Sequence, residues 1–65
     1  MIVPDGTLVR STKRRKVLRR VVEIRQLGDL VLYLPYYGKW RQVQRTSLDG
    51  WDRWCKVHKA KVVRP

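Results

Sequence analysis

The chain has 65 residues, with 16 Lys or Arg against 5 Asp or Glu, and carries a formal net charge of +11 at pH 7. This length excludes a second domain, so we expect one small domain over residues 1–65, with loose tails at residues 1–5 and 64–65. The single cysteine, Cys55, excludes an internal disulfide and any zinc site built from several cysteines of the chain.

The first predicted elements are a turn and a short strand. Residues 4–6 (PDG) are a turn signal, and residues 7–10 (TLVR) then predict a strand. The next stretch, STKRRKVLRRVVEIR over residues 11–25, fits two structures. As a helix, it would begin at the Ser-Thr pair at its start and end at Gly28.

The same stretch also fits a long basic strand. In that case Leu18, Val22 and Ile24 share one face at period two. The several β-branched residues favour a strand. A turn predicted at residues 26–29 leads into another β-rich run, which indicates a hairpin. We therefore predict the strand, with the helix as the alternative.

The clearest strand covers residues 30–34 (LVLYL), which are apolar on both faces and expected at the centre of a sheet. Pro35 should end regular pairing, because proline has no backbone N–H to donate. A turn is expected at residues 36–39 (YYGK). Residues 40–45 (WRQVQR) then predict the next strand.

A short helix and a closing strand complete the chain. Residues 46–49 (TSLD) match a capping box with Asp in place of Glu, which predicts a helix through residues 52–55. Gly50 weakens this helix, so a single turn or a 3₁₀ segment is the alternative. Residues 57–63 predict a closing strand. We therefore expect a mainly β fold, a small five-stranded antiparallel barrel with one short helix or 3₁₀ turn before the last strand.

This order of elements resembles that of SH3-like barrels, in which four strands, a helical turn and a last strand follow one another. The resemblance is carried by GDLVLYLPYYGKW in the middle of the chain and by KVHKAKVV near its end. The chain is similar to the basic, nucleic-acid-binding members of that fold, such as the C-terminal domain of retroviral integrases and Tudor-like modules. The resemblance implies a binding module rather than an enzyme and specifies no target.

The positive charge is concentrated in one segment. Half of the 16 Lys and Arg residues lie between residues 10 and 25, where Glu23 is the only acid. The cations of this segment repel one another, which lowers the stability of the fold. A bound polyanion, which releases its counterions on binding, would offset this loss of stability. A sequence pI near 11.0 is also typical of nucleic-acid-binding domains. No apolar run is long enough to span a membrane, so we expect a cytoplasmic or nucleoid-associated protein without a membrane partner.

The turn that follows Pro35 combines aromatic and basic side chains. Bases stack on exposed rings while cations bind phosphates, so this combination suits a single-stranded nucleic acid. A cage for methylated lysine and ordinary cross-strand packing are the alternatives for these rings. The residues concerned are Tyr36, Tyr37, Lys39, Trp40 and Arg41.

Catalysis is not expected from this sequence. Asp49 and Asp52 are explained by the preference for acids near a helix start. No orienting group accompanies Cys55 and His58, so we expect a small buried hydrophobe and a surface residue of the last strand. The two tryptophans of the predicted helix are expected in the core. No metal or other cofactor is expected.

The sequence therefore predicts a nucleic-acid-binding module, with DNA favoured over RNA. It would act as a small transcriptional or chromatin-like regulator, or as an accessory protein of a phage or mobile element. The alternative is a protein-interaction module or inhibitor that binds an acidic or nucleic-acid-binding surface of a partner enzyme. A homodimer is also open. The predicted contact residues are Lys13, Arg14, Arg15, Lys16, Arg19, Arg20, Tyr36, Tyr37, Lys39, Trp40 and Arg41.

Overall fold

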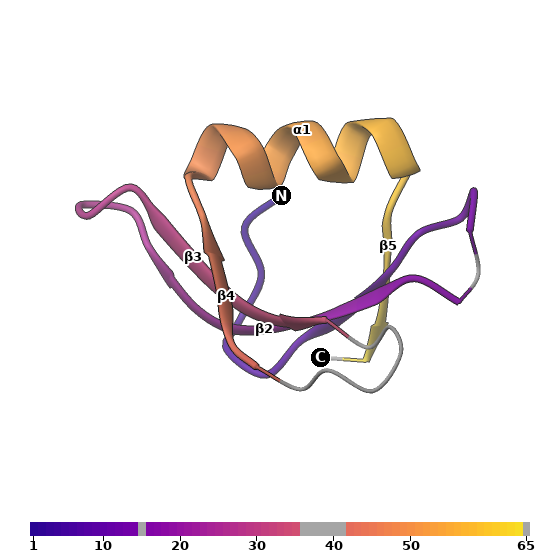
Figure 1. Cartoon of the computed structure of the whole chain (residues 1–65), viewed down its shortest axis with the longest axis horizontal. Coiled ribbons are helices and arrows are strands. Elements are labelled where there is room, and N and C mark those ends of the chain that lie inside the picture. Colours follow the sequence, from indigo (N-terminus) through magenta and orange to yellow (C-terminus); the bar gives the residue numbers. More distant parts are fainter. Residues whose placement is uncertain (15, 36–41, 65) are drawn as a thin grey trace.

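The computed structural model describes residues 1–14, 16–35 and 42–64. These residues form a mainly β structure with one helix, as expected (Figure 1). The elements are β1 (Leu8–Arg10), β2 (Leu18–Arg25), β3 (Leu30–Pro35), β4 (Gln44–Thr46), α1 (Leu48–His58) and β5 (Lys61–Arg64). The strands make one antiparallel sheet in the order β4-β3-β2-β1-β5.

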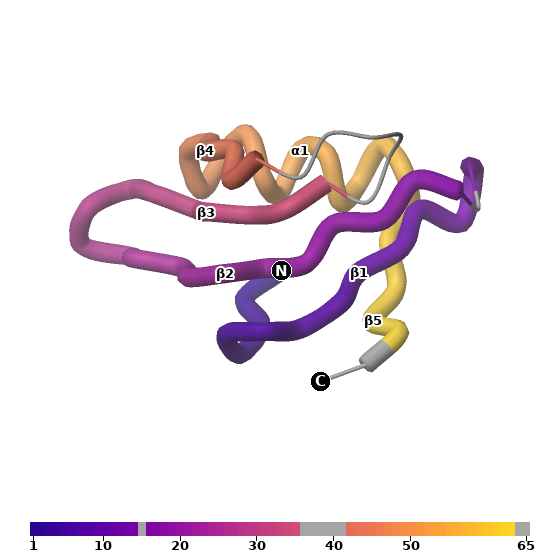
Figure 2. Tube along the Cα trace, turned by 60° about the horizontal axis from the view of Figure 1, so that its bottom comes forward, coloured from indigo at the N-terminus to yellow at the C-terminus, as the bar shows by residue number. Residues whose placement is uncertain are grey.

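The core lies between the sheet and the helix, which crosses one side of the curved sheet (Figure 1). Val9, Val21 and Val31, from three neighbouring strands, are fully buried against Trp51. Cys55 lies one turn further along the helix and is also buried, as expected. We call the side of the sheet that faces α1 the inner face, and the opposite side the outer face. Figure 2 shows β2 and β3 side by side as a long hairpin, with β1 and β5 beyond β2.

A β-bulge in β2 changes which side chains face the helix. The pairing of β2 with β3 shifts between Val21 and Glu23, so Val22 is an extra residue. Val21 is fully buried, whereas Val22 is 37% exposed. The prediction that Leu18, Val22 and Ile24 share one face is therefore wrong, because the bulge breaks the alternation and only Ile24 packs against the core.

Several predicted strands differ in extent from the observed ones. The strand is confirmed in the second half of the basic stretch, where β2 lies, and the helix alternative is wrong. The described part of residues 11–17 forms the loop between β1 and β2. The strand predicted at residues 40–45 is β4, which begins only at Gln44; Gln42 and Val43 belong to no strand.

The helix is longer than predicted. Ser47, rather than Thr46, is its N-cap, because the Ser47 hydroxyl accepts a hydrogen bond from the Gly50 N–H at 3.0 Å. The 11-residue helix continues through Gly50, so the single-turn alternative is wrong. Its C-cap is Lys59, which adopts a left-handed conformation with φ 45°. The closing strand predicted at residues 57–63 is therefore wrong at its start, because residues 57 and 58 are helical and β5 begins only at Lys61.

The N-terminal segment, expected as a loose tail, contacts the helix. The Trp51 Nε1–H donates to the carbonyl of Met1 at 2.8 Å, and the Met1 amino group pairs with the Asp52 carboxylate. Val3 packs against the core. Gly6, with φ 86°, then turns the chain into β1, a conformation in which glycine avoids the strain of a side chain.

The two edges of the sheet are β4 and β5. Within the described residues no pairing joins these edges, so the sheet is open there. Among these same residues, no helix has both the length and the apolar character needed to span a membrane.

Candidate nucleic-acid interface

The loop between β1 and β2 is attached to the C-terminal end of α1. The Thr12 N–H and hydroxyl both donate to the carbonyl of His58, at 3.0 and 3.2 Å. Within the loop, the Ser11 hydroxyl oxygen accepts the backbone N–H groups of Lys13 and Arg14 at 3.2 and 3.0 Å. These bonds fix the turn and hold it beside the helix end.

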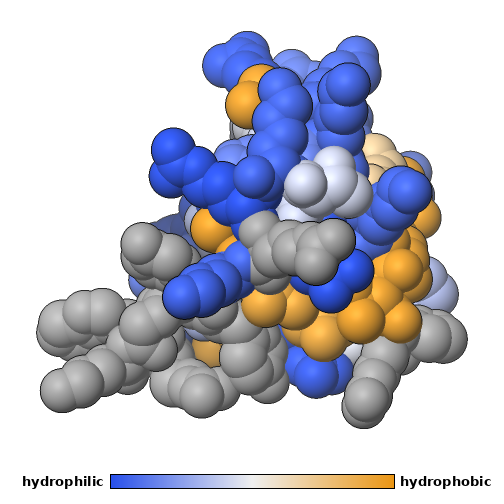
Figure 3. Space-filling view, turned by 90° about the vertical axis from the view of Figure 1, so that its right-hand side faces the viewer, coloured by the Kyte–Doolittle hydropathy of each residue, from blue (hydrophilic) through white to orange (hydrophobic). Residues whose placement is uncertain are grey.

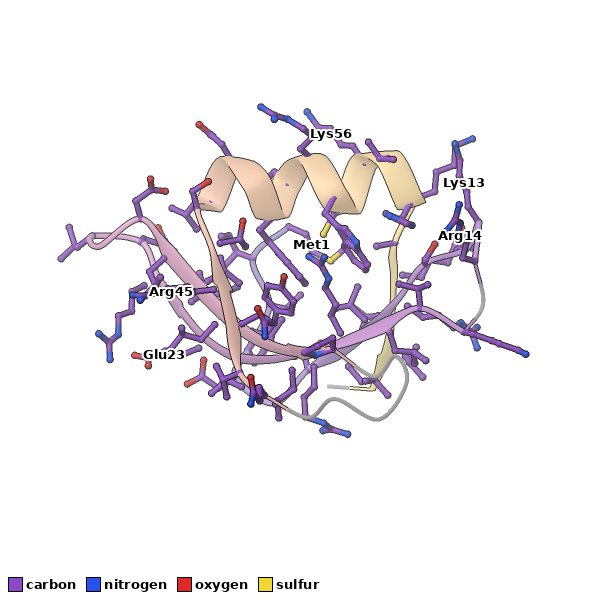
Figure 4. All side chains as sticks on the ribbon, in the orientation of Figure 1. Met1, Lys13, Arg14, Glu23, Arg45 and Lys56 are labelled. Carbon is purple, nitrogen blue, oxygen red and sulfur yellow. The ribbon has the colours of Figure 1, made fainter. Side chains whose placement is uncertain are left out.

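This attachment gathers cations from two segments that are far apart in the sequence. The loop and the last turn of the helix both expose basic side chains, and Figure 4 shows Lys13 and Arg14 beside the C-terminal end of α1. We call this surface the basic end. Its described members are Lys13, Arg14, Lys16, Lys56 and Lys59.

The acids lie elsewhere. Glu23 pairs with Arg25 at 2.8 Å, a hydrogen bond that lowers the pKa of Glu23, and Figure 4 shows Glu23 far from the basic end. Asp29 accepts the Leu48 N–H at the helix start, at 2.9 Å. The two acids of α1 lie in its first half, and Asp5 lies in the turn before β1. Asp52 lies one helical turn before Lys56, and its carboxylate pairs with the Met1 amino group. No acid lies in the loop or in the last turn of the helix.

The helix dipole explains only part of this arrangement. The C-terminal end of a helix carries partial negative charge, which stabilises a nearby cation by about 0.3–1 kcal/mol. Lys56 and His58 lie in that last turn. The loop cations come from a different element, however, and their presence beside the helix cations adds like-charge repulsion. The number of cations at this end is therefore larger than stabilisation of the helix dipole explains.

His58 is the last residue of α1, so its predicted place on the last strand is wrong. Ser11 is fully buried, and its two hydroxyl lone pairs accept the two N–H bonds of the loop. The Ser11 O–H is therefore directed at His58 Nδ1, 2.8 Å away. This network assigns a neutral imidazole with its proton on Nε2. Burial, and then the charges of Arg19, Arg14 and Lys13, lower the pKa of His58 in agreement.

Arg19, a predicted nucleic-acid contact, lies on the inner face. Its guanidinium carbon is 4.2 Å from the ring centroids of both Tyr33 and Trp54, a double cation–π contact. Trp51 and His58 extend this layer, with ring centroids 5.6 and 4.7 Å from that of Trp54. Burial lowers the pKa of Arg19, although an arginine stays charged. Arg19 therefore packs between sheet and helix.

Arg20 also has a partner within the protein, because its Nη1 donates to the carbonyl of Gly6 at 3.0 Å. Of the predicted contacts that the structure describes, Lys13, Arg14 and Lys16 are the exposed ones. The other predicted contacts lie outside the described residues: Arg15, Tyr36, Tyr37, Lys39, Trp40 and Arg41.

Lys56 and Lys59 were missed by the sequence reasoning. The KVHK run alternates in hydropathy, which led to a strand prediction and separated these lysines from the basic loop. A helix extended by one turn would have placed Lys56 and His58 at its C-terminal end, where cations are favoured. This preference for cations at a helix C-terminus was the feature of the sequence that indicated the longer helix.

The potential metal ligands of the described residues are not grouped into a site, and their thiol is buried. No three His, Cys, Asp or Glu side chains of the described residues form a group that could hold a metal ion. Cys55 is a free buried thiol, and burial raises its pKa, which disfavours the reactive thiolate.

An apolar area adjoins the basic end. Figure 3 shows hydrophilic side chains gathered in the upper part of this side of the molecule, and a hydrophobic area at the lower right. β5 runs on that side and exposes Val62 and Val63, at 50% and 40%. Comparisons with known proteins add no further information, because the chain matches no family model, no curated protein and no solved structure.

Proposed function

We propose that this chain binds nucleic acid electrostatically through the basic end. The observation that carries the proposal is the segregation of charge. Five exposed cations lie on a loop and a helix end that hydrogen bonds hold together, and no acid lies in the loop or in the last turn of the helix. A polyanion that binds such a surface releases its own condensed counterions, which drives association.

The mechanism is phosphate capture. Lys and Arg contacts to phosphates fix the position of a protein on nucleic acid but carry little sequence information. We therefore propose modest sequence preference, with DNA ahead of RNA. A role as a small regulator or accessory protein in the cytoplasm or on the nucleoid fits such a module.

The fold is proposed to be related to SH3-like barrels. The strand order β4-β3-β2-β1-β5, with a helix between β4 and β5, supports this relation. The five strands are antiparallel, and the elements follow one another in the order expected of such a barrel, which supports the relation as well. Contact between the two edge strands would be needed to close the sheet into a barrel.

An acidic protein partner is the second candidate, and the exposed valines of β5 favour it. An apolar area beside a charged one is a common composition for protein interfaces. In that case the basic end would bind acidic side chains of a partner enzyme and Val62 and Val63 would add apolar contact.

The proposed function is tested by fluorescence-anisotropy titration of labelled DNA with paired variants. The variant Lys13→Gln/Arg14→Gln keeps the backbone N–H groups that bind Ser11 and removes two cations of the basic end. We expect weaker binding, and a slope of log affinity against log salt that is smaller by about 2.

The matched control is Arg25→Gln/Arg45→Gln, which removes the same charge from the opposite side of the molecule, where Figure 4 places Arg45. This control should bind with nearly the affinity of the wild type. Equal losses in both variants would mean that only net charge matters, and the basic end would then be no specific interface.

A further inference from the structure

A second group of cations lies on the outer face of the sheet, where β1 meets β5. Arg10 and Lys61 are directly opposite each other in the antiparallel register of these strands, and both side chains are exposed. Val9, the neighbour of Arg10, is fully buried on the inner face, so Arg10 and its partner point the other way. No helix or strand that the structure describes covers this face.

The Arg10–Lys61 pair contradicts a local rule of sheet structure. Like charges directly opposite one another destabilise an antiparallel strand pair. On its other side, Arg10 is paired with Leu18, so no acid offsets the repulsion across either strand. Violations of this kind are expected at functional sites, where a ligand removes the conflict.

Apolar side chains flank this pair of cations. Leu18 and Leu8 occupy outer-face positions of β2 and β1 beside Arg10, and both are partly exposed. A nucleic-acid backbone alternates anionic phosphates with sugars, and proteins contact both. A corner of the sheet that combines cations with leucines suits such a backbone better than it suits a purely acidic surface.

The aromatic rings of residues 1–14, 16–35 and 42–64 do not form a platform for base stacking. Tyr33, Trp51 and Trp54 all lie in the layer between sheet and helix, where each contacts another ring or Arg19. Trp54 also borders a shallow hollow of about 300 Å³ on the helix flank, but Arg19 lies over its ring. Single-strand binders depend on rings that bases can cover, whereas the bases of a duplex are already stacked on one another.

We infer that Arg10 and Lys61 form a second phosphate-binding surface, continuous with the basic end, and that the ligand is a nucleic-acid duplex held by its backbone. This inference rests on the proposed function. The two surfaces adjoin, because β1 ends at Arg10 and the chain runs from there directly into the loop that carries Lys13 and Arg14. The molecule is 31 Å long, which covers about nine base pairs.

The first test compares Arg10→Gln and Lys61→Gln with the control Arg45→Gln, which removes an exposed charge from β4 at the other edge of the sheet. Removal of either member of the like-charged pair should raise Tm by about 1–5 °C relative to the control. The same changes should weaken duplex binding and reduce the salt slope by about 1 each. A gain in stability that accompanies a loss of affinity is not expected of a residue with a purely structural role.

The second test compares a duplex of about 14 base pairs with a single strand of the same sequence in competition. We expect the duplex to bind about tenfold more tightly. Equal or tighter binding of the single strand, or wild-type duplex affinity and slope in both variants, would overturn this inference while leaving nucleic-acid binding intact. Absence of salt-dependent binding to either probe would overturn the proposed function as well.

Discussion

Arginine side chains serve two different purposes in this molecule. The guanidinium of Arg19 lies between the rings of Tyr33 and Trp54, whereas Arg14 projects from the loop at the basic end. Sequence position does not distinguish the two, because both belong to the same basic stretch. What distinguishes them is the face of the strand, and Arg19 shares its face with the buried Val21.

Replacement of Arg19 by Ala should therefore destabilise the protein. The change removes two cation–π contacts and the packing of the side-chain stem, and we expect a loss of about 2 kcal/mol in the free energy of unfolding. Urea denaturation at neutral pH measures it, with Arg14→Ala as the control that should stay within about 0.5 kcal/mol of the wild type. Equal stability of the two variants would show that the ring layer does not depend on Arg19.

The environment of His58 makes stability depend on pH. Burial lowers the pKa of His58 below its ordinary value of 6.5, so the unfolded chain binds a proton more readily than the folded chain. The contribution of His58 to stability is then fully present above its ordinary pKa of about 6.5 and is lost as the pH falls below that value. Urea denaturation across this pH range should show the loss in the wild type and its absence in His58→Gln. His58 is the only histidine of the chain, so a similar loss in His58→Gln would contradict this assignment.

At the scale of elements, local sequence patterns predicted which segments form strands. They predicted less well which side chains share a face of a strand and where each element ends. The apolar run of β3 and the turn before it were sufficient to predict the β2–β3 hairpin. The bulge at Val22 was not predictable, because Val21 and Ile24 are also β-branched and the sequence contains no glycine there. The helix end was missed because Lys59 adopts a left-handed conformation that usually belongs to glycine.

Gly50 shows how packing overrides helix propensity. A Cβ at this position would meet the Thr46 hydroxyl at less than contact distance, and would also lie close to the Ser47 oxygen that caps the helix. Alanine in place of glycine inside a helix normally raises the free energy of unfolding by roughly 1 kcal/mol. We expect Gly50→Ala to show no such gain.

The same substitution should become stabilising once the obstacle is removed. In a Thr46→Ala background, Gly50→Ala should raise the free energy of unfolding by up to about 1 kcal/mol. A thermal or urea double-mutant cycle measures this coupling. If alanine at position 50 stabilises both backgrounds equally, the contact with Thr46 does not limit the helix start.

The candidate site was predictable in part, for a similar reason. Charge density alone identified the loop with Lys13, Arg14 and Lys16. The contribution of Lys56 and Lys61 depends on tertiary contacts, because the helix end and β5 meet the loop only in the folded chain. The inward position of Arg19 depends on pairing register, which composition does not contain.

At the scale of the whole molecule, the charges divide into two regions. One end has acids that pair with bases or accept hydrogen bonds at the helix start, and the other collects cations without acids. This arrangement repels itself and reduces the stability of a domain that is already small. A ligand with regularly spaced negative charge would offset this loss of stability at both the basic end and the Arg10–Lys61 pair.

The most direct measurement is the salt dependence of wild-type binding to a duplex of about 14 base pairs, between about 0.05 and 0.2 M salt. If the five cations of the basic end and the Arg10–Lys61 pair all contact phosphates, the slope of log affinity against log salt should be about −6. A slope of about −1 or weaker would mean that at most one phosphate is neutralised. The segregated charge would then serve something other than nucleic acid.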